Sequence, residues 1–357
     1  MKRYGVILAG GGGTRFWPLS RQALPKQLLN LSGRDVMVNE ALERLVQIVE
    51  RENIFIVTNR AQTDKIEQAT KGRLAWGRIL SEPAARNTAA CIGYAAMVIE
   101  KKYGDGVMVI TPSDAYIRDD KAFAAALELA ISAAEQTDKL VTVGITPTFP
   151  ATGYGYIRQG EEKEGIKGVK SVLQFVEKPD AATAEEYLKS GEYVWNSGTF
   201  VWKASVILQK FKVLLPDIYE GLCRMSECFG GAQEAKAAEE IYPTLRSISV
   251  DYGILEKSND ILVVSGEFGW SDVGSWDMLG ALHPVDESGN VSVGDVIALD
   301  TKNSVLYSSG RTLAVVGVDN LVVVETPDAV LVCPKDKTQD VKKLVEELKI
   351  RERKELL

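Results

Sequence analysis

Residues 6–27 read VILAGGGGTRFWPLSRQALPKQ, and this stretch decides the fold class that we expect. The apolar residues 6–9 predict the end of a buried strand, and four glycines then leave the main chain uncovered. Glycine accepts a positive φ and lets backbone N–H groups approach an anion closely. Arg15 and Lys26 follow as cations that can reach phosphate oxygens, and Pro18 and Pro25 predict a stiff, extended segment between them. The stretch therefore predicts a strand that ends in a phosphate-binding loop.

The glycine run differs from the two common phosphate-binding loops. A P-loop requires Gly-Lys-Ser or Gly-Lys-Thr, and neither occurs in the chain. A dinucleotide-binding loop requires a glycine three residues after Gly12, where this sequence has Arg15. The missing glycine and the charge of Arg15 argue against an NAD-dependent oxidoreductase, and an ordinary glycine-rich turn stays open as the alternative.

The composition is that of a soluble globular protein with enough residues for two domains. The 357 residues are 45% hydrophobic and 25% charged, with a net charge of −7. The negative charge argues against a nucleic-acid partner, and no apolar run reaches the length of a membrane span. Residues 1–3 lead directly into the first strand and leave no room for a signal peptide. We therefore expect a cytoplasmic protein with neither a membrane nor a nucleic-acid partner.

The chain is poor in the residues of nucleophilic catalysis. Its single histidine, His283, precedes a proline and is interpreted as structural or exposed, which argues against Ser/His and Cys/His pairs. The cysteines show no paired framework, and with one histidine they predict free thiols rather than a zinc site. These cysteines are Cys91, Cys223, Cys228 and Cys333.

Apolar strands and amphipathic helices alternate through the first part of the chain. Strands are predicted at residues 54–58, 78–81, 107–110, 140–145, 172–177 and 261–264. Helices are predicted at 38–49, 63–70, 89–102, 121–134, 181–190 and 205–215. Asn87 or Thr88 is expected to cap the helix that begins at residue 89, and residues 194–200 are interpreted as turn-like. This alternation predicts an α/β fold with a mixed, mostly parallel sheet covered by helices on both faces.

The pattern of predicted elements changes after about residue 290. Short β-rich pieces at 296–299, 304–307, 313–317, 321–324 and 330–333 follow one another without a helix. This regular spacing predicts a small β-domain of solenoid character. Residues 336–357 predict an amphipathic helix packed on that domain. We therefore expect a domain of residues 1–285 and a second domain of residues 286–357.

Two carboxylates and a further lysine complete a predicted phosphate-transfer site. Ligands of open α/β sheets bind beyond the carboxyl ends of the strands, and Asp114 follows such an end. Asp272, in a Gly/Trp-rich turn, supplies a second carboxylate, and the pair suits Mg²⁺, which keeps substrate oxygens in its shell. Lys178 follows another strand and suits a second phosphate. With no plausible nucleophilic side chain, this set points to direct in-line transfer at phosphorus.

Several separate motifs in one order resemble the sugar-1-phosphate nucleotidyltransferase family. The general motifs are LAGGGGTRFWPLSR with PKQ at residues 8–27, and FVEKP at residues 175–179. More selective motifs resemble the members that use GTP and mannose 1-phosphate. These are EP and RNTA within 82–89, NSG at 196–198, DYGILEK at 251–257 and GWSDVGSW at 269–276.

The resemblance covers nearly the whole chain and implies both a fold and a reaction. The implied fold is a Rossmann-like nucleotidyltransferase domain followed by a short β-helix-like domain that is often used in dimerisation, so we expect a homodimer. The implied reaction is the attack of mannose 1-phosphate on the α-phosphorus of GTP, which gives GDP-mannose and pyrophosphate. The sugar phosphate needs no general base, because its second pKa of about 6 leaves it largely dianionic at neutral pH.

The resemblance also implies a role for each site residue. For the nucleotide, the backbone of Leu8, Ala9, Gly10 and Gly11 and the segment with Glu82, Pro83, Asn87 and Thr88 would hold guanine and ribose, with further contacts from Gly13 and Thr14. Arg15 and Lys26 would hold the β- and γ-phosphates and stabilise the leaving pyrophosphate, and Asp114 and Asp272 would bind Mg²⁺ or another divalent cation. For the sugar phosphate, Gly155, Glu177 and Asn196 would contact mannose, and Lys178 its phosphate.

Four positions depart from the family pattern, and none of them removes a charged catalytic group. Gly12 stands in place of serine, Ala115 of histidine, Thr199 of methionine and Gly253 of alanine. These departures put the strictness of base and sugar preference in doubt. The alternatives are another pair, such as glucose 1-phosphate with UTP or dTTP, and a silent subunit that binds nucleotide-sugar. Many relatives carry a phosphomannose isomerase domain after the last β segment. The present sequence ends at Leu357, so we do not expect that activity.

Overall fold

The computed structural model describes residues 1–357 and divides the chain into two compact units. Unit 1 contains residues 1–10, 41–113 and 119–270, and unit 2 contains residues 11–40, 114–118 and 271–357. The units group residues by packing and not by chain order, so the domain boundary expected at residue 285 stays a prediction. No helix combines the length and the apolar character that crossing a membrane requires.

Unit 1 is built on a nine-stranded sheet with the order β3-β2-β1-β4-β9-β6-β10-β8-β7. Strands β8 and β9 run opposite to the other seven, so the mixed, mostly parallel sheet is confirmed. The strands are β1 (Arg3–Leu8), β2 (Ile54–Asn59), β3 (Ile79–Glu82), β4 (Val107–Pro112), β6 (Leu140–Ile145), β7 (Tyr156–Glu162), β8 (Val169–Val176), β9 (Tyr193–Lys203) and β10 (Ile261–Gly266). Two short strands, β5 (Tyr116–Ile117) and β11 (Trp270–Ser271), pair with each other.

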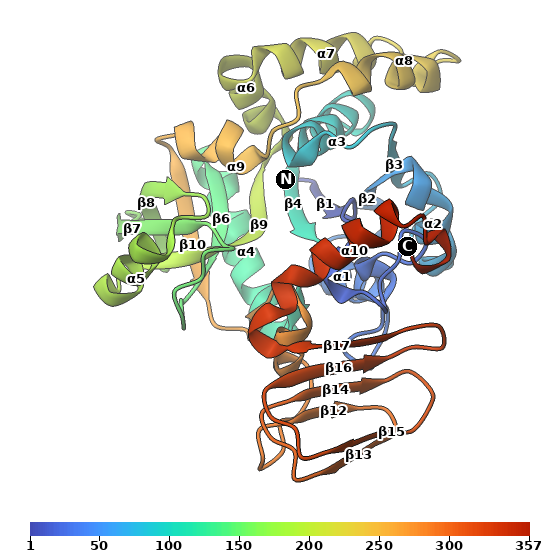
Figure 1. The fold of residues 1–357 in the computed structure, drawn as a ribbon. Helices are drawn as coiled ribbons and strands as arrows, with labels where there is room; N and C mark the ends of the chain where they lie inside the picture. The colour runs from blue at the N-terminus through green and yellow to red at the C-terminus, as the bar shows by residue number, and fades with distance from the viewer. The chain divides into compact units, whose positions relative to one another are not determined.

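Helices cover both faces of this sheet (Figure 1). Tyr4 and Val6 share one apolar cluster with residues of α3, α6 and α7. Between them, Gly5 faces Leu45 of α1 on the other side, where an added Cβ would lie 3.0 Å from Leu45 Cδ1. The helices are α1 (Met37–Val46), α2 (Thr63–Ala69), α3 (Asn87–Tyr103), α4 (Asp120–Thr137), α5 (Ala181–Ser190), α6 (Ala204–Leu214), α7 (Pro216–Ser226), α8 (Glu234–Ile241) and α9 (Val250–Gly253).

The strand order places a switch point between β1 and β4. The chain runs outward from β1 to β2 and β3, and it then returns to β4 on the other side of β1. Leu8 and Pro112 pair at the carboxyl ends of these strands, and Ser113 N–H donates to Leu8 O at 3.0 Å. In open α/β sheets, ligands bind at such a point. The glycine run and Asp114 follow these two neighbouring strand ends directly in the chain.

Unit 2 contains a short β-solenoid. Strands β12, β14 and β16 pair in parallel, β17 closes that sheet antiparallel, and β13 and β15 form a second parallel pair (Figure 1). The β-helix-like region is therefore confirmed. The elements are β12 (Val291–Val293), β13 (Val296–Leu299), β14 (Val305–Ser308), β15 (Leu313–Val316), β16 (Leu321–Glu325), β17 (Val330–Pro334) and α10 (Val341–Ile350).

The structure contradicts the local prediction for residues 194–200. They are not turn-like but form the middle of β9, which pairs with β4 on one side and β6 on the other. The sequence signal misled because Gly198 has a φ of 72° and the β6–β9 register shifts between Thr142 and Gly144. A bulged strand carries the polar and glycine residues that otherwise mark a turn.

The predicted helix cap is also wrong. Helix α3 begins at Asn87 itself, and its cap residue, Arg86, makes no side-chain cap bond. Thr88 Oγ1 instead accepts a hydrogen bond from Val250 N–H at 3.0 Å. The hydroxyl is therefore used to hold the start of α9 rather than the start of α3.

Two other segments are less regular than expected. Between the two prolines, Arg21 and Leu24 exchange backbone hydrogen bonds of 2.9 and 3.0 Å, so this segment turns and is not extended. The single helix predicted for residues 336–357 is α10 with a short 3-10 segment on each side, Lys335–Asp340 and Lys354–Leu356. Helices α7 and α8 were not predicted.

Candidate active site

Lys26 is the centre of a polar cluster in unit 2. Its buried ammonium donates to Asp114 O at 2.9 Å, to Asp114 Oδ2 at 3.1 Å and to Asp272 O at 2.5 Å. The ring of Phe16 lies 5.8 Å from the same Nζ atom. A buried ammonium requires such oxygen partners. The structure thus brings Lys26 to the carboxylate of Asp114 and to the backbone carbonyl oxygen of Asp272, and the metal-binding roles of these two residues stay predictions.

Glycines let the backbone approach this cluster. Gly13 has a φ of 61°, and a Cβ there would lie 2.3 Å from Lys26 Cβ. A Cβ on Gly274 would lie 2.7 Å from Asp272 Oδ2 and 3.3 Å from Arg15 Nη1. The Asp272 carboxylate and the Arg15 guanidinium therefore both border the backbone at Gly274.

The turn that carries Asp272 is strained. The next residue, Val273, is fully buried and has a φ of 42°. A β-branched residue in the left-handed region is a genuine outlier, and it persists only where the surroundings hold it. Such strain clusters at functional sites, which is consistent with a catalytic role for this turn.

In unit 1, Glu82 forms a buried acceptor at the end of β3. The hydroxyl of Tyr242 donates to Glu82 Oε1, and Oε2 lies 3.5 Å from where a Cβ on Gly10 would be. Burial raises the pKa of the Glu82 carboxyl, and the Tyr242 hydrogen bond partly offsets that rise. Of the predicted nucleotide residues in this unit, Glu82 and Gly10 are thus neighbours.

The other predicted nucleotide residues have structural partners or lie apart. Ala9 N–H donates to Val57 O at 2.8 Å, and Ala9 O accepts from Thr58 Oγ1 at 2.8 Å. Asn87 is exposed and has a φ of 62°. Leu8 ends β1, Pro83 follows β3, and Gly11 and Thr14 belong to unit 2. An added Cβ at Gly11 would meet no atom within 4 Å.

The four residues predicted to hold the sugar phosphate form one cluster in unit 1. Lys178 Nζ lies 2.5 Å from Glu177 Oε1, and Asn196 N–H donates to Gly155 O at 2.8 Å. A Cβ on Gly155 would lie 2.5 Å from Glu177 Oε2, so a larger residue there would displace this carboxylate from its present position. Burial lowers the pKa of Lys178, but the hydrogen bond and charge of Glu177 outweigh it, so the pKa is raised overall.

Asp251 belongs to this cluster and was missed as a site residue. Asn196 Nδ2 donates to Asp251 Oδ1 at 3.0 Å, while Asn196 Oδ1 accepts from Thr142 Oγ1 at 3.2 Å. Burial and the nearby Glu177 carboxylate raise the pKa of Asp251 to about 6. Two sequence signals were available: Asp251 begins the motif DYGILEK, and it is a carboxylate inside the largely apolar stretch 248–255, where burial of a charge is costly.

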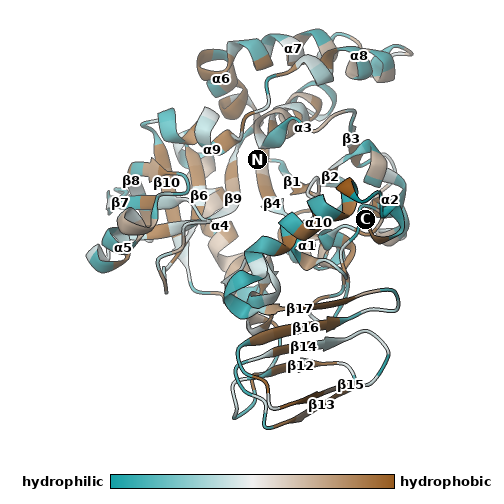
Figure 2. Cartoon of the chain, in the orientation of Figure 1, coloured by the Kyte–Doolittle hydropathy of each residue, from teal (hydrophilic) through white to brown (hydrophobic).

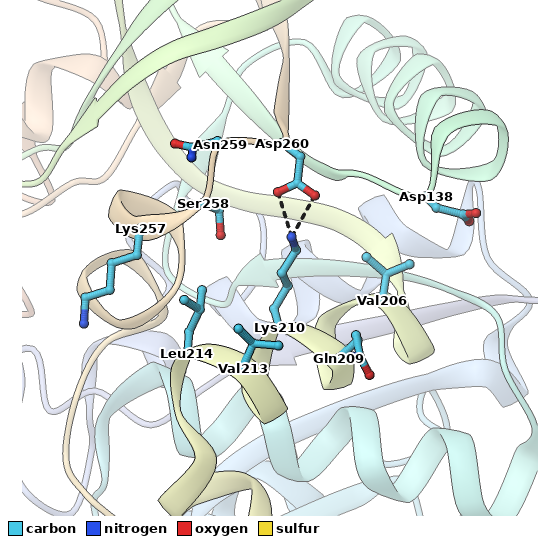
Figure 3. A pocket seen from close by; sticks show the side chains of 10 residues that line it. All are labelled: Asp138, Val206, Gln209, Lys210, Val213, Leu214, Lys257, Ser258, Asn259 and Asp260. Carbon is cyan, nitrogen blue, oxygen red and sulfur yellow. Dashed lines mark hydrogen bonds and ion pairs between the residues drawn. The ribbon is translucent and has the colours of Figure 1, made fainter.

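A separate cavity of about 490 Å³ lies beside α6 (Figure 3). Lys210 donates to both carboxylate oxygens of Asp260 at 2.7 Å, and Val206, Val213 and Leu214 are among the other lining residues. None of the predicted site residues lines it. The bidentate ion pair satisfies the lysine, so we assign the cavity no part in catalysis.

The fold and the two clusters define a class of protein. An α/β sheet whose strand order reverses next to a glycine run, a buried lysine among oxygens of Asp114 and Asp272, and a polar cluster around Lys178 are the features expected of a nucleotide-dependent transferase. The family model for nucleotidyl transferases matches residues 4–288, and the model for a MannoseP isomerase/GMP-like beta-helix domain matches residues 294–348. The chain therefore belongs to the nucleotidyl transferase family.

Individual proteins similar to this chain indicate a more specific group within the family. The chain is 43% identical over 347 residues to the xanthan biosynthesis protein XanB of Xanthomonas campestris pv. campestris, covering 96% of this chain and 73% of that protein. It is 40% identical over 353 residues to the mannose-1-phosphate guanylyltransferase of Escherichia coli, covering 98% and 74%. A crystal structure described as mannose-1-phosphate geranyltransferase, from Thermus thermophilus, has 36% identity and a TM-score of 0.89, covering 98% of this chain and 100% of that one.

Proposed function

We propose that this protein is a mannose-1-phosphate guanylyltransferase, which transfers GMP from GTP to α-D-mannose 1-phosphate and releases pyrophosphate. The relatives of about 40% identity support the reaction. The observation that carries the proposal is the cluster of Gly155, Glu177, Lys178 and Asn196, joined by Asp251. It combines a half-exposed cation for a phosphate monoester with several oxygen and amide groups for sugar hydroxyls.

The sugar phosphate is the nucleophile in the proposed reaction. One of its oxygens forms a bond to the α-phosphorus of GTP, while the bond from that phosphorus to the bridging β-oxygen breaks and pyrophosphate leaves. The phosphate needs no base, because it is already largely dianionic at neutral pH. Lys178, whose side chain is 53% exposed, holds this phosphate and orients it for in-line attack.

The residues of unit 2 act on the phosphates of GTP. Arg15 and Lys26 offset the charge that develops on the leaving pyrophosphate, because fixed cations in a site stabilise charge without reorganisation. Asp114, with its side chain 43% exposed, and Asp272 supply hard oxygen ligands, a donor set that fits Mg²⁺ or another divalent cation. When bound, that cation would neutralise phosphate charge and fix the orientation of the triphosphate.

Glu82 supports guanine as the base. The Watson–Crick edge of guanine presents two adjacent N–H donors, which suit a carboxylate acceptor, whereas uracil and thymine present one donor between two carbonyl oxygens. Tyr242 engages Glu82 Oε1, and Oε2 faces Gly10. Repulsion between this carboxylate and pyrimidine carbonyls would disfavour UTP and dTTP.

We further propose a homodimer formed through the solenoid. Strands β13 and β15 expose Ile297, Leu299 and Val316 to more than half of their surface, and both strands are strongly hydrophobic (Figure 2). Apolar faces of this kind mark interaction sites. Light scattering of the protein and of an Ile297→Lys variant tests this proposal, since only the wild type should form a dimer.

A cytoplasmic location is also proposed, because all four cysteines are free and thiols stay reduced in that compartment.

Pyrophosphate release tests the proposed reaction. The purified protein with Mg²⁺ is assayed with GTP, UTP, dTTP and ATP, each paired with mannose 1-phosphate and with glucose 1-phosphate. Release confined to GTP with mannose 1-phosphate is expected. Release with a different pair would move the specificity to another nucleotide or hexose, and no release from folded protein that still binds nucleotide would favour a silent subunit.

A further inference from the structure

We propose that Gln339 is a positioning residue that holds Arg15 for the phosphates of the nucleotide. This inference rests on the proposed function, in which Arg15 acts on the triphosphate. Arg15 Nη1 donates to Gln339 Oε1 at 2.9 Å, and Gln339 Nε2 donates to Ser275 Oγ at 2.9 Å. All three residues belong to unit 2.

A buried network fixes the far side of Gln339. Ser275 and Thr338 are almost fully buried, and their hydroxyls donate to the same atom, Asp277 Oδ1, at 2.6 and 2.5 Å. Gln339 is therefore tied through its neighbour Thr338 and through Ser275 to the turn that carries Asp272. A hydrogen-bonded network of this kind stabilises one side-chain orientation.

The same segment holds the glycine-rich stretch at a second point. Trp17 Nε1 donates to Leu356 O at 2.8 Å, and both residues belong to one apolar cluster with Val341, Val345 and Leu348 of α10. Residues 335–357 thus contact the phosphate-binding stretch on both sides of Phe16. Gln339 lies in the region that matches the β-helix model, whereas Arg15 lies in the region that matches the transferase model.

The chemistry of glutamine suits this role. An arginine side chain has considerable rotamer freedom, and ordering it before the ligand binds lowers the entropy cost of binding. An amide oxygen engages one N–H group and leaves the guanidinium charge uncompensated. A carboxylate at this position would form an ion pair with Arg15 and compete with the phosphates for it. Gln339 therefore orients the cation without neutralising it.

The test compares Gln339→Met, which keeps the length of the side chain, with Gln339→Glu, which keeps an acceptor but adds a charge. Loss of one hydrogen bond of this exposed type predicts a KM for GTP raised about three- to tenfold in Gln339→Met. The KM for mannose 1-phosphate should stay unchanged. Gln339→Glu should raise the KM for GTP further, and Lys342→Met, on exposed α10 surface, is the matched control.

A double-mutant cycle separates positioning from a general structural effect. In an Arg15→Ala background, Gln339→Met should have no further effect, because its partner is gone. An equal effect with and without Arg15, or an unchanged KM for GTP in Gln339→Met, would overturn the proposal. Calorimetric binding of inorganic pyrophosphate and GTP repeats the comparison without turnover, so the role of Gln339 is tested even if the proposed reaction fails.

Discussion

Replacement of Asp251 by asparagine should remove a pH dependence that the wild-type fold carries. Burial and the Glu177 carboxylate raise the pKa of Asp251 from 3.8 to about 6. Between these values the folded protein binds more protons than the unfolded chain, so its free energy of unfolding falls as the pH rises. From about pH 5 to about pH 7.5 this linkage predicts a loss of about 1.4 kcal/mol. The Asp251→Asn variant lacks the titrating group, so its free energy of unfolding should fall by about 1.4 kcal/mol less than that of the wild type over this pH range.

Urea unfolding at the two pH values measures this difference directly. The asparagine introduced by Asp251→Asn is neutral at both values and can still accept a hydrogen bond from Asn196, so the packing is largely kept. Asp64→Asn, at an exposed position on α2, is the matched control and should keep the wild-type slope. Equal losses of stability in the wild type and Asp251→Asn would refute the reasoning, since Asp251 would then titrate alike in the folded and unfolded states.

Three further substitutions test the proposed site. Asp272→Asn should abolish pyrophosphate release while thermal unfolding changes little, and retained Mg²⁺-dependent turnover would remove Asp272 from the mechanism. Lys178→Ala should raise the KM for mannose 1-phosphate about tenfold or more through loss of a charge-assisted contact; an equal rise for GTP in steady-state kinetics would show a misassigned lysine. Gly155→Ala places a Cβ 2.5 Å from Glu177 Oε2, so the same assay should show weaker sugar-phosphate binding, and unchanged kinetics would mean that the carboxylate moves freely.

The parallel part of the fold was predictable because its signals are local. Strand β6 is a largely apolar run that is buried throughout, and the periodicity of α4 places Phe123, Leu127 and Ile131 inward, as the structure confirms. Strand β9 was not predictable in the same way. Its pairing with β4 and β6 outweighs the turn propensity of Asn196 and Gly198, and tertiary pairing of this kind leaves no local trace.

The site residues likewise fall into those that sequence motifs predicted and those that only the structure revealed. Short motifs identified Lys26, Asp114 and Asp272 although they are far apart in sequence, and the structure brings them together. Asp251 and Gln339 were not identified as site residues, because each is assigned by a hydrogen bond to a distant residue: Asp251 stood in the motif DYGILEK without a role, and Gln339 stood in no motif. Their functional assignment requires the distances, and these appear only once the chain has folded.

The three cations of the proposed site differ in the groups that balance their positive charge. Lys26 is surrounded by oxygens of Asp114 and Asp272, Lys178 is paired with Glu177, and Arg15 is held by a neutral amide. Because the chain has a net charge of −7, a cation in the site is expected to attract nearby carboxylates. A phosphate that reaches Lys26 or Lys178 must therefore share the ammonium with an oxygen already present, whereas the side-chain hydrogen bond of Arg15 goes to a neutral amide. In the proposed site the greatest gain on phosphate binding is therefore expected at Arg15, and a neutral partner suits that role better than a carboxylate would.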